Sequence, residues 1–180
     1  MSTFFTADTH FGHGRIIELS QRPFGSVNEM QEVFIRNWNA VVTPDDVVWH
    51  LGDFGIDDIE PGKALDIFCR LNGTKHLILG NHDQEVTHSL PWESVSESKL
   101  LDTEEGQVFL CHYPMLTWPR ARKGAIHLFG HLHSEWLGTD LSADVGVDAW
   151  DYRPVMFPEI RRRMKKQKPN EVFTKTKARM

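Results

Sequence analysis

The chain has 180 residues, of which 40% are hydrophobic and 25% are charged. This balance is typical of a soluble globular domain with a substantial core, and it excludes an intrinsically disordered chain. No apolar run approaches the roughly 20 residues that a membrane-spanning helix needs, the N-terminus lacks the basic segment of a secretory signal, and two cysteines are too few for a disulfide scaffold. We therefore expect a cytoplasmic protein with no membrane partner.

The first half of the chain alternates predicted strands with predicted helices. A strand is expected over residues 2–7, and the pair Ser26 and Glu29 has the spacing of a helix-capping box. The apolar residues from Met30 to Val41 then recur at helical spacing. A buried strand over 46–52 ends in glycine, a helix covers 63–71, and a strand over 75–80 again ends in glycine.

The second half of the chain is rich in strands. We expect strands over 107–112, 125–131, 144–150 and 153–157 with no long helix between them, and Pro158 suits the first turn of a last helix. Helix-linked strands followed by a strand-rich half predict an α/β fold in which two sheets pack together with helices outside.

The net charge of −5 is unevenly distributed along the chain. Nine of the twenty Lys and Arg residues lie in residues 161–180, where Glu171 is the one acid. We expect residues 1–165 to form a single domain and residues 166–180 a flexible basic tail. Such a tail is a candidate contact for nucleic acid. The alternative is a solvated, frayed terminus, which is favoured because Phe173 is the tail's one aromatic residue.

Polar side chains follow five of the predicted strands at the point where each strand ends. They are Asp8 and His10, Asp53, Asn81 with His82 and Asp83, His112, and His131 with His133. Strand ends at one edge of an α/β sheet are where such folds build their sites. Residues two apart in extended chain point to the same side, so Asp8 with His10, and His131 with His133, can each offer two ligands to one volume.

These residue types indicate a metal site. Imidazole, carboxylate and amide ligands suit first-row metals such as Mn, Fe, Zn, Co and Ni better than Ca. Without His82 and Asp83, seven candidate ligands remain. They are more than one tetrahedral zinc needs, and about the number for two metals that share a carboxylate. Any one of these residues could instead be a satisfied turn residue, a role that Asn and Asp often take. Their joint placement favours the metal site.

The order of these motifs resembles that of the calcineurin-like metallophosphoesterases, in particular small single-domain bacterial or phage members. The matching blocks are D-T-H (8–10), G-D (52–53), G-N-H-D (80–83), His112 and G-H-L-H (130–133). The resemblance implies that Asp8, His10 and His133 hold one metal. It further implies that Asn81, His112 and His131 hold the other. Asp53 would then bridge the two metals, and His82 would face the substrate as a general acid.

The resemblance also implies a fold, an activity and a cofactor. The fold is a four-layer α/β/β/α sandwich of two mixed β-sheets flanked by helices, in agreement with the order of elements. The activity is hydrolysis of phosphate esters by a hydroxide that bridges two divalent metals, manganese first, with iron, zinc, nickel and cobalt as alternatives. Asp83 is expected to hold a metal-binding histidine through a hydrogen bond.

The residues after the G-D block narrow the choice of substrate. Protein phosphatases of this family continue that block with an Asp-Arg pair, whereas this chain has Phe54 and Gly55, which disfavours a protein substrate. The chain is also short, which favours small substrates, and phosphodiesters derived from nucleotides, cyclic nucleotides or nucleic acid come ahead of monoesters. His13 and Arg15 are candidate phosphate contacts.

Four alternatives stay open at this point. They are a phosphomonoesterase acting on a small phosphorylated metabolite, a non-catalytic scaffold with the same fold, a mononuclear zinc hydrolase, and a helical phosphohydrolase that uses the adjacent His82 and Asp83.

Overall fold

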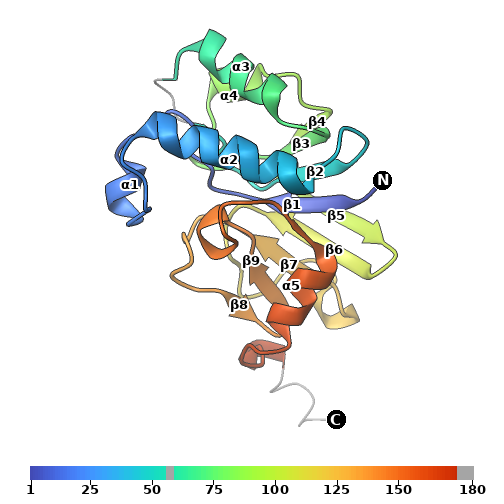
Figure 1. Ribbon diagram of the computed structural model, residues 1–180. Helices are drawn as coiled ribbons and strands as arrows, with labels where there is room; N and C mark the ends of the chain where they lie inside the picture. The colour runs from blue at the N-terminus through green and yellow to red at the C-terminus, as the bar shows by residue number, and fades with distance from the viewer. Residues whose placement is uncertain (56–58, 174–180) are drawn as a thin grey trace, which may run out of the picture.

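Two five-stranded sheets pack face to face in the computed structural model, which describes residues 1–55 and 59–173 (Figure 1). In the first sheet β1 (Thr3–Thr6), β2 (Val47–His50), β3 (Thr74–Ile78) and β4 (Ser94–Ser96) are parallel, and β10 (Val155–Met156) pairs antiparallel with β1. In the second sheet β6 (Gly106–Cys111), β7 (Ile126–Phe129) and β9 (Ser142–Asp144) are parallel, and β5 (Ser98–Thr103) and β8 (Gly138–Thr139) run antiparallel at its edges. The prediction of two mixed sheets flanked by helices is confirmed.

The longer helices cover the outer face of the first sheet. They are α2 (Val27–Val41) and α3 (Pro61–Arg70), accompanied by the single turns α1 (Ile16–Leu19) and α4 (Glu85–His88) (Figure 1). Ser26 caps α2 as predicted, because its Oγ accepts a hydrogen bond from the Glu29 amide at 3.2 Å. The Glu29 carboxylate reaches back to the Gly25 amide at 2.7 Å, one residue earlier than in a standard capping box. No helix of the described residues is long and apolar enough to cross a membrane.

The core has three parts. One lies between the first sheet and its helices and includes Phe34, Trp38 and Phe54. The second part lies between the sheets and contains Phe5, Leu51 and Ile78 from the first sheet against residues of β6, β7 and β9. The third part covers the outer face of the second sheet. There a loop with a 3₁₀ turn at Ala121–Lys123, rather than an α-helix, supplies Trp118 and Ala121.

The segment predicted as a strand over 144–150 is only partly one. Asp144 ends β9, and Val147–Ala149 form a 3₁₀ turn. The Asp144 carboxylate accepts a hydrogen bond from the Gly146 amide at 2.7 Å, and this local bond turns the chain out of the sheet. The alternation of apolar residues in this segment therefore reflects burial rather than extended backbone.

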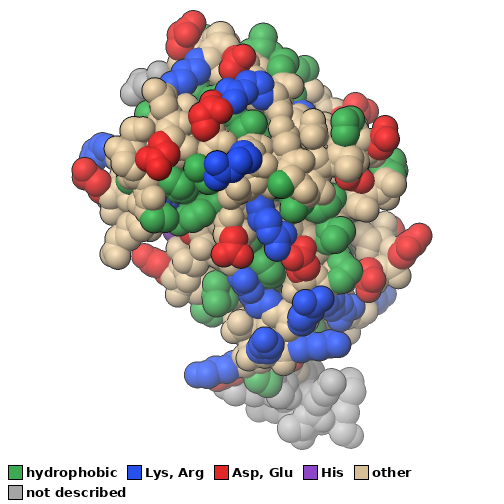
Figure 2. All heavy atoms as spheres, viewed as in Figure 1, with side chains coloured by type: hydrophobic (Ala, Val, Ile, Leu, Met, Phe, Trp, Pro, Cys, Tyr) green, Lys and Arg blue, Asp and Glu red, His purple; other side chains and the backbone are tan. Residues whose placement is uncertain are grey.

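Contacts with the rest of the chain continue past residue 165, where the basic tail was predicted to begin. Helix α5 (Phe157–Met164) packs against β1, β9 and β10, and Lys and Arg side chains gather over it (Figure 2). Beyond it, the Asn170 amide donates to Asp140 Oδ1 at 2.8 Å, and the ring of Phe173 packs edge-on against Trp118. The basic segment is thus tied to the domain as far as Phe173, which its charge alone did not predict. Residues 174–180 lie outside the described part of the chain.

Candidate metal centre

Six of the seven predicted ligands gather into two clusters at the carboxyl ends of the strands. Asp8, His10 and His133 form the first cluster, and Asp53, His112 and His131 form the second. Within each cluster the candidate ligand atoms all lie within 4.8 Å of one another. Each cluster draws on both sheets, because residues 8, 10 and 53 follow β1 and β2, whereas residues 112, 131 and 133 follow β6 and β7.

The backbone at the ligands is unusual. Five of the seven predicted ligands have positive φ angles: Asp8 (59°), His10 (50°), Asp53 (57°), His131 (72°) and His133 (45°). Left-handed backbone is uncommon for residues other than glycine and gathers at functional sites. These turns correct the expectation of extended backbone at both pairs. Asp8 and His10 do serve one cluster, but His131 and His133 are directed into different ones.

Asp53 lies between the two clusters. Its Oδ2 is 3.5 Å from His10 Nε2 in the first cluster and 3.5 Å from His112 Nε2 in the second. Its Oδ1 accepts a hydrogen bond from the His82 amide at 2.9 Å, which fixes the direction of the carboxylate. One carboxylate oxygen is thus within reach of ligands of both clusters, the position that a bridging ligand requires.

Three candidate ligand atoms that face one another in the second cluster are all hydrogen-bond acceptors. His112 Nδ1 donates to the Leu51 carbonyl oxygen at 2.7 Å, so Nε2 of the neutral ring carries a lone pair. That lone pair faces Asn81 Oδ1 at 3.1 Å and Asp53 Oδ2 at 3.5 Å, and these are acceptors too. Three acceptors that converge on one point fit a cation between them. Asn81 therefore joins the second cluster.

The first cluster has the same character. Both ring nitrogens of His10 are buried without a hydrogen-bond partner among the described residues. Burial, together with nearby Asp144, raises the pKa of the Asp8 carboxyl well above its usual value. Burial, together with nearby His133, lowers the pKa of His10 well below its usual value. A divalent cation would stabilise both the buried Asp8 carboxylate and the His10 imidazole, whose nitrogens have no hydrogen-bond partner among the described residues. The residues present therefore fit a metal.

Asp83 does not hold a histidine, contrary to the prediction. Its carboxylate accepts three backbone amide hydrogen bonds, from Asp53 at 2.8 Å, Phe54 at 2.9 Å and Gly80 at 2.9 Å. These bonds join the loop after β2 to the loop after β3. The side chain thus stabilises the turn that carries Asp53.

Two residues that the sequence did not single out contact the first cluster. Asp148 Oδ2 accepts a hydrogen bond from His133 Nδ1 at 2.8 Å, and Arg22 forms a two-bond ion pair with Asp148. Burial raises the pKa of Asp148, but the hydrogen bonds from His133 and Arg22 outweigh burial and hold that pKa below its usual value. Asp148 was hidden in the segment predicted as a strand, and Arg22 in the loop after α1.

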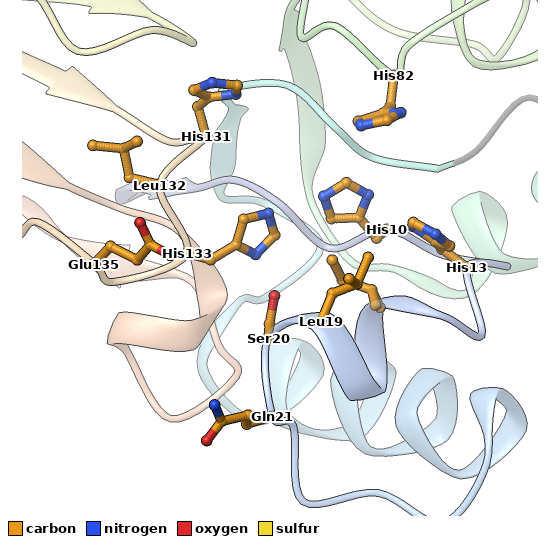
Figure 3. A pocket seen from close by; sticks show the side chains of 11 residues that line it. His10, His13, Leu19, Ser20, Gln21, His82, His131, Leu132, His133 and Glu135 are labelled. Atoms are coloured by element: carbon orange, nitrogen blue, oxygen red, sulfur yellow. The ribbon is translucent and has the colours of Figure 1, made fainter.

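A cavity of about 490 Å³ opens beside the clusters. Figure 3 shows the His10, His82, His13 and His133 rings around it, with Leu19 and Ser20 on the opposite wall. The His82 ring is 5.3 Å from that of His10 and 6.2 Å from that of His13, centre to centre. Of the two residues predicted to contact substrate, His13 lines this cavity, whereas the exposed Arg15 is not among its lining residues.

The fold and the two clusters together define a metal-binding protein with a place for two neighbouring divalent ions beside an open cavity. A family model of calcineurin-like phosphoesterases matches residues 1–150. The chain therefore belongs to the calcineurin-like phosphoesterase family, a family of hydrolases that act on phosphate esters.

Two relatives and a solved structure match this chain over most of its length. The chain is 30% identical over 172 residues to an uncharacterized protein of Methanocaldococcus jannaschii, covering 92% of each. It is 29% identical over 182 residues to the gene 66 protein of Mycobacterium phage L5, covering 83% of this chain and 87% of that protein. A solved structure of a protein of unknown function from Aquifex aeolicus has a TM-score of 0.72 at 26% identity, and the match covers 89% of this chain and 97% of that one.

Proposed function

We propose that the protein is a dinuclear metal-dependent phosphodiesterase that hydrolyses small phosphodiesters of nucleotide or nucleic-acid origin in the cytoplasm. The observation that carries the dinuclear part is the position of Asp53 Oδ2, 3.5 Å from a histidine nitrogen of each cluster. Two divalent ions held there, manganese in the first place, supply a nucleophilic hydroxide at neutral pH and Lewis-acid stabilisation of the phosphate oxygens.

In this proposal His82 donates a proton to the leaving group. Its ring is exposed to the cavity, and its backbone amide is held by Asp53 Oδ1 at 2.9 Å, so the loop after β3 presents the ring beside the first cluster. A protonated imidazole at this place can donate a proton to a departing alkoxide. His13 lies across from His82 and can contact a phosphate oxygen.

The charge of the cavity supports a diester over a monoester. Among the described residues that line it there is no Lys or Arg, and Glu135 adds a carboxylate at the rim. A phosphomonoester is largely a dianion near pH 7, and Arg is the residue that proteins most often use to bind such a group in two-bond contacts. A diester carries one negative charge and needs less compensation from side chains.

The shape of the cavity supports a second substituent on the phosphate. Ile16, Leu19 and Leu132 add apolar side chains to its lining. Tyr113 is 44% exposed next to the second cluster, with its ring edge-on to His131 at 4.9 Å between centres. An aromatic face and an apolar wall next to the phosphate site suit a nucleoside rather than a bare phosphate.

The test of this function is an assay of manganese-loaded protein against mono-, di- and cyclic phosphoesters, with metal-free protein as the control. We expect turnover of nucleotide diesters, at a higher kcat/KM than that of the matching monoesters. Faster hydrolysis of a small phosphomonoester would replace the proposal by the monoesterase alternative, and no turnover of any ester would favour a non-catalytic scaffold.

The role of His82 is tested by the substitution His82→Ala. We expect both metals to stay bound while kcat on an unactivated diester falls about 10²–10⁴-fold, the usual contribution of a general acid. On a nitrophenyl ester, whose leaving group needs little protonation, the loss should be much smaller. Equal losses on both substrates would remove His82 from the acid role.

A comparison with Asp53→Asn separates proton donation from metal binding. The amide keeps the shape of the side chain but loses the charge that two cations share, so we expect metal content to fall well below that of the His82→Ala protein. Unchanged occupancy of both sites in Asp53→Asn would show that this carboxylate is not the bridge.

A further inference from the structure

A buried arginine contacts the backbone of the first cluster and is not among the residues that line the cavity. Arg22 is only 3% exposed. Its Nε and Nη2 donate to the two carboxylate oxygens of Asp148 at 2.7 and 2.8 Å. Nη2 also donates to the Asp8 carbonyl oxygen at 2.7 Å, and Nη1 to the Thr9 carbonyl oxygen at 3.2 Å.

The same carboxylate orients a candidate ligand. His133 Nδ1 donates to Asp148 Oδ2 at 2.8 Å, so the lone pair of the neutral ring is on Nε2. This lone pair can bind a cation together with Asp8 and His10 of the first cluster. Asp148 itself sits in the 3₁₀ turn Val147–Ala149, and the Val147 amide donates to the Ala7 carbonyl oxygen at 3.0 Å. Three segments far apart in the chain thus meet at one ion pair.

The backbone that Arg22 contacts is the left-handed turn of the first cluster. Asp8 and His10 have φ angles of 59° and 50°, a conformation that surrounding contacts must maintain. The Arg22 guanidinium donates hydrogen bonds to the carbonyl oxygens of Asp8 and Thr9 in this turn. A buried ion pair is weak evidence of stabilisation by itself, since apolar replacements are often equally stable. The contacts of the Arg22–Asp148 pair with this turn and with His133 indicate that the pair positions the residues of the first cluster.

We propose that Arg22 and Asp148 form a positioning pair for the first metal site, one that sets the metal affinity of that site and leaves the second site unaffected. The asymmetry follows from the second cluster, where His112 is oriented by the Leu51 carbonyl oxygen at 2.7 Å instead of by this pair. The proposal rests on the two clusters holding metal, and it does not depend on which phosphate ester is hydrolysed.

The experiment is a titration of the metal-free protein with manganese in the absence of substrate. Calorimetry measures the affinity of each site, and electron paramagnetic resonance detects whether the bound ions are spin-coupled. In the wild-type protein we expect two bound ions and the signal of a spin-coupled pair. In Asp148→Asn and in Arg22→Gln we expect one site to weaken about 10–100-fold, the usual effect of losing a partner of a ligating histidine. The other site should keep its affinity, and the signal should become that of an isolated ion at one equivalent.

A matched control comes from an exposed arginine that forms a similar two-bond pair. Arg70 donates to Glu32 at 2.8 and 2.6 Å between α3 and α2, on the outer face of the protein. Arg70→Gln should leave both affinities unchanged. A second variant, Arg22→Lys, keeps the charge but not the fork, and it should fall between the wild type and Arg22→Gln.

The ligand variant His133→Ala identifies the affected site. It should weaken the same site as Asp148→Asn, and adding Asp148→Asn to it should cause little further loss because the two act through one ring. Folded Asp148→Asn protein with two unchanged affinities, or with equal weakening of both sites, would overturn the proposal. Should Arg22→Gln fail to fold, Asp148→Asn and Arg22→Lys still decide. Absence of phosphodiesterase activity would leave these binding results standing, so the two proposals fail separately.

Discussion

Single histidines in this protein differ in function because of what faces each ring nitrogen. Both ring nitrogens of His10 lack a hydrogen-bond partner among the described residues, and His112 Nε2 faces side-chain oxygens of Asn81 and Asp53. His127, in contrast, is fully buried between β6 and β9, with Nδ1 3.2 Å from the Phe109 carbonyl oxygen and Nε2 3.1 Å from the Tyr113 carbonyl oxygen. The position of His127 inside a predicted strand indicates a core residue, and the structure agrees. The difference between a structural and a metal-binding histidine is therefore visible in the partners rather than in burial.

His127 makes stability depend on pH. Burial lowers its pKa from 6.5 to about 4, and the hydrogen bonds to the two carbonyl groups only partly oppose that effect. Between pH 6.5 and about 4, His127 binds a proton in the unfolded chain but stays neutral in the folded protein. The free energy of unfolding therefore falls as the pH falls through this window. The loss should reach about 3 kcal/mol at and below pH 4.

Urea unfolding of metal-free protein at several pH values measures this dependence. His127→Gln should unfold with a shallower pH slope than the wild type, whereas the exposed His88→Gln should keep the wild-type slope. Parallel slopes for wild type and His127→Gln would mean that the two carbonyl oxygens keep the imidazolium as stable as in water.

At the scale of elements, the turns between strand and loop place the ligands, and two of them depend closely on glycine. A Cβ on Gly130 would lie 2.6 Å from the Ala7 Cβ and 2.7 Å from Asp8 Oδ2, closer than real Cβ atoms approach. Gly130 thus lets the loop after β7 pass directly against the residue that carries the first cluster. The same holds at Gly80, where a Cβ would overlap the Asp53 carboxylate.

Gly130→Ala should therefore displace Asp8. We expect loss of metal from the first site and a decrease of about 1–3 kcal/mol in the free energy of unfolding, the usual range for overpacking. Metal content and urea unfolding check both effects. In the control Gly62→Ala the new methyl group would meet only the movable end of the Glu60 side chain at 3.1 Å, and metal content should not change. Full occupancy of both sites in Gly130→Ala would contradict this account.

Much of the site could be predicted at this scale, because a strand followed by glycine and a polar residue is a local pattern. The two-sheet fold and the six candidate ligands that gather into the two clusters follow from such patterns and from the order of the motifs. Left-handed backbone at Asp8 or His133 depends on long-range hydrogen bonds, such as that from the His131 amide to Asp8 at 2.9 Å, and no local pattern contains it. Arg22 and Asp148 are 126 residues apart and could not be paired from the sequence.

At the scale of the whole molecule, the two clusters lie across the junction of the sheets. In the first, Asp8 and His10 come from the first sheet and His133 from the second; in the second, Asp53 comes from the first sheet and His112 and His131 from the second. Without a cation, the buried carboxyl of Asp8 is close to Asp144, Asp53 and Asp148, and all three raise its pKa. Metal ions at the clusters would join the two sheets and relieve this repulsion.

Metal removal should therefore lower the stability of the entire domain rather than of the loops alone. A ligand that binds only the folded state at 1,000 times its Kd stabilises it by about 4 kcal/mol per site. For a chain of this size that corresponds to a decrease in Tm on the order of 10 °C when a chelator removes one ion. Calorimetry with manganese and with chelator measures the shift, and Asp53→Asn should show a smaller shift because it binds less metal in the first place. If chelation empties both sites and leaves Tm unchanged, the ions do not join the sheets, and the inter-sheet core around Leu51 and Ile78 alone holds them together.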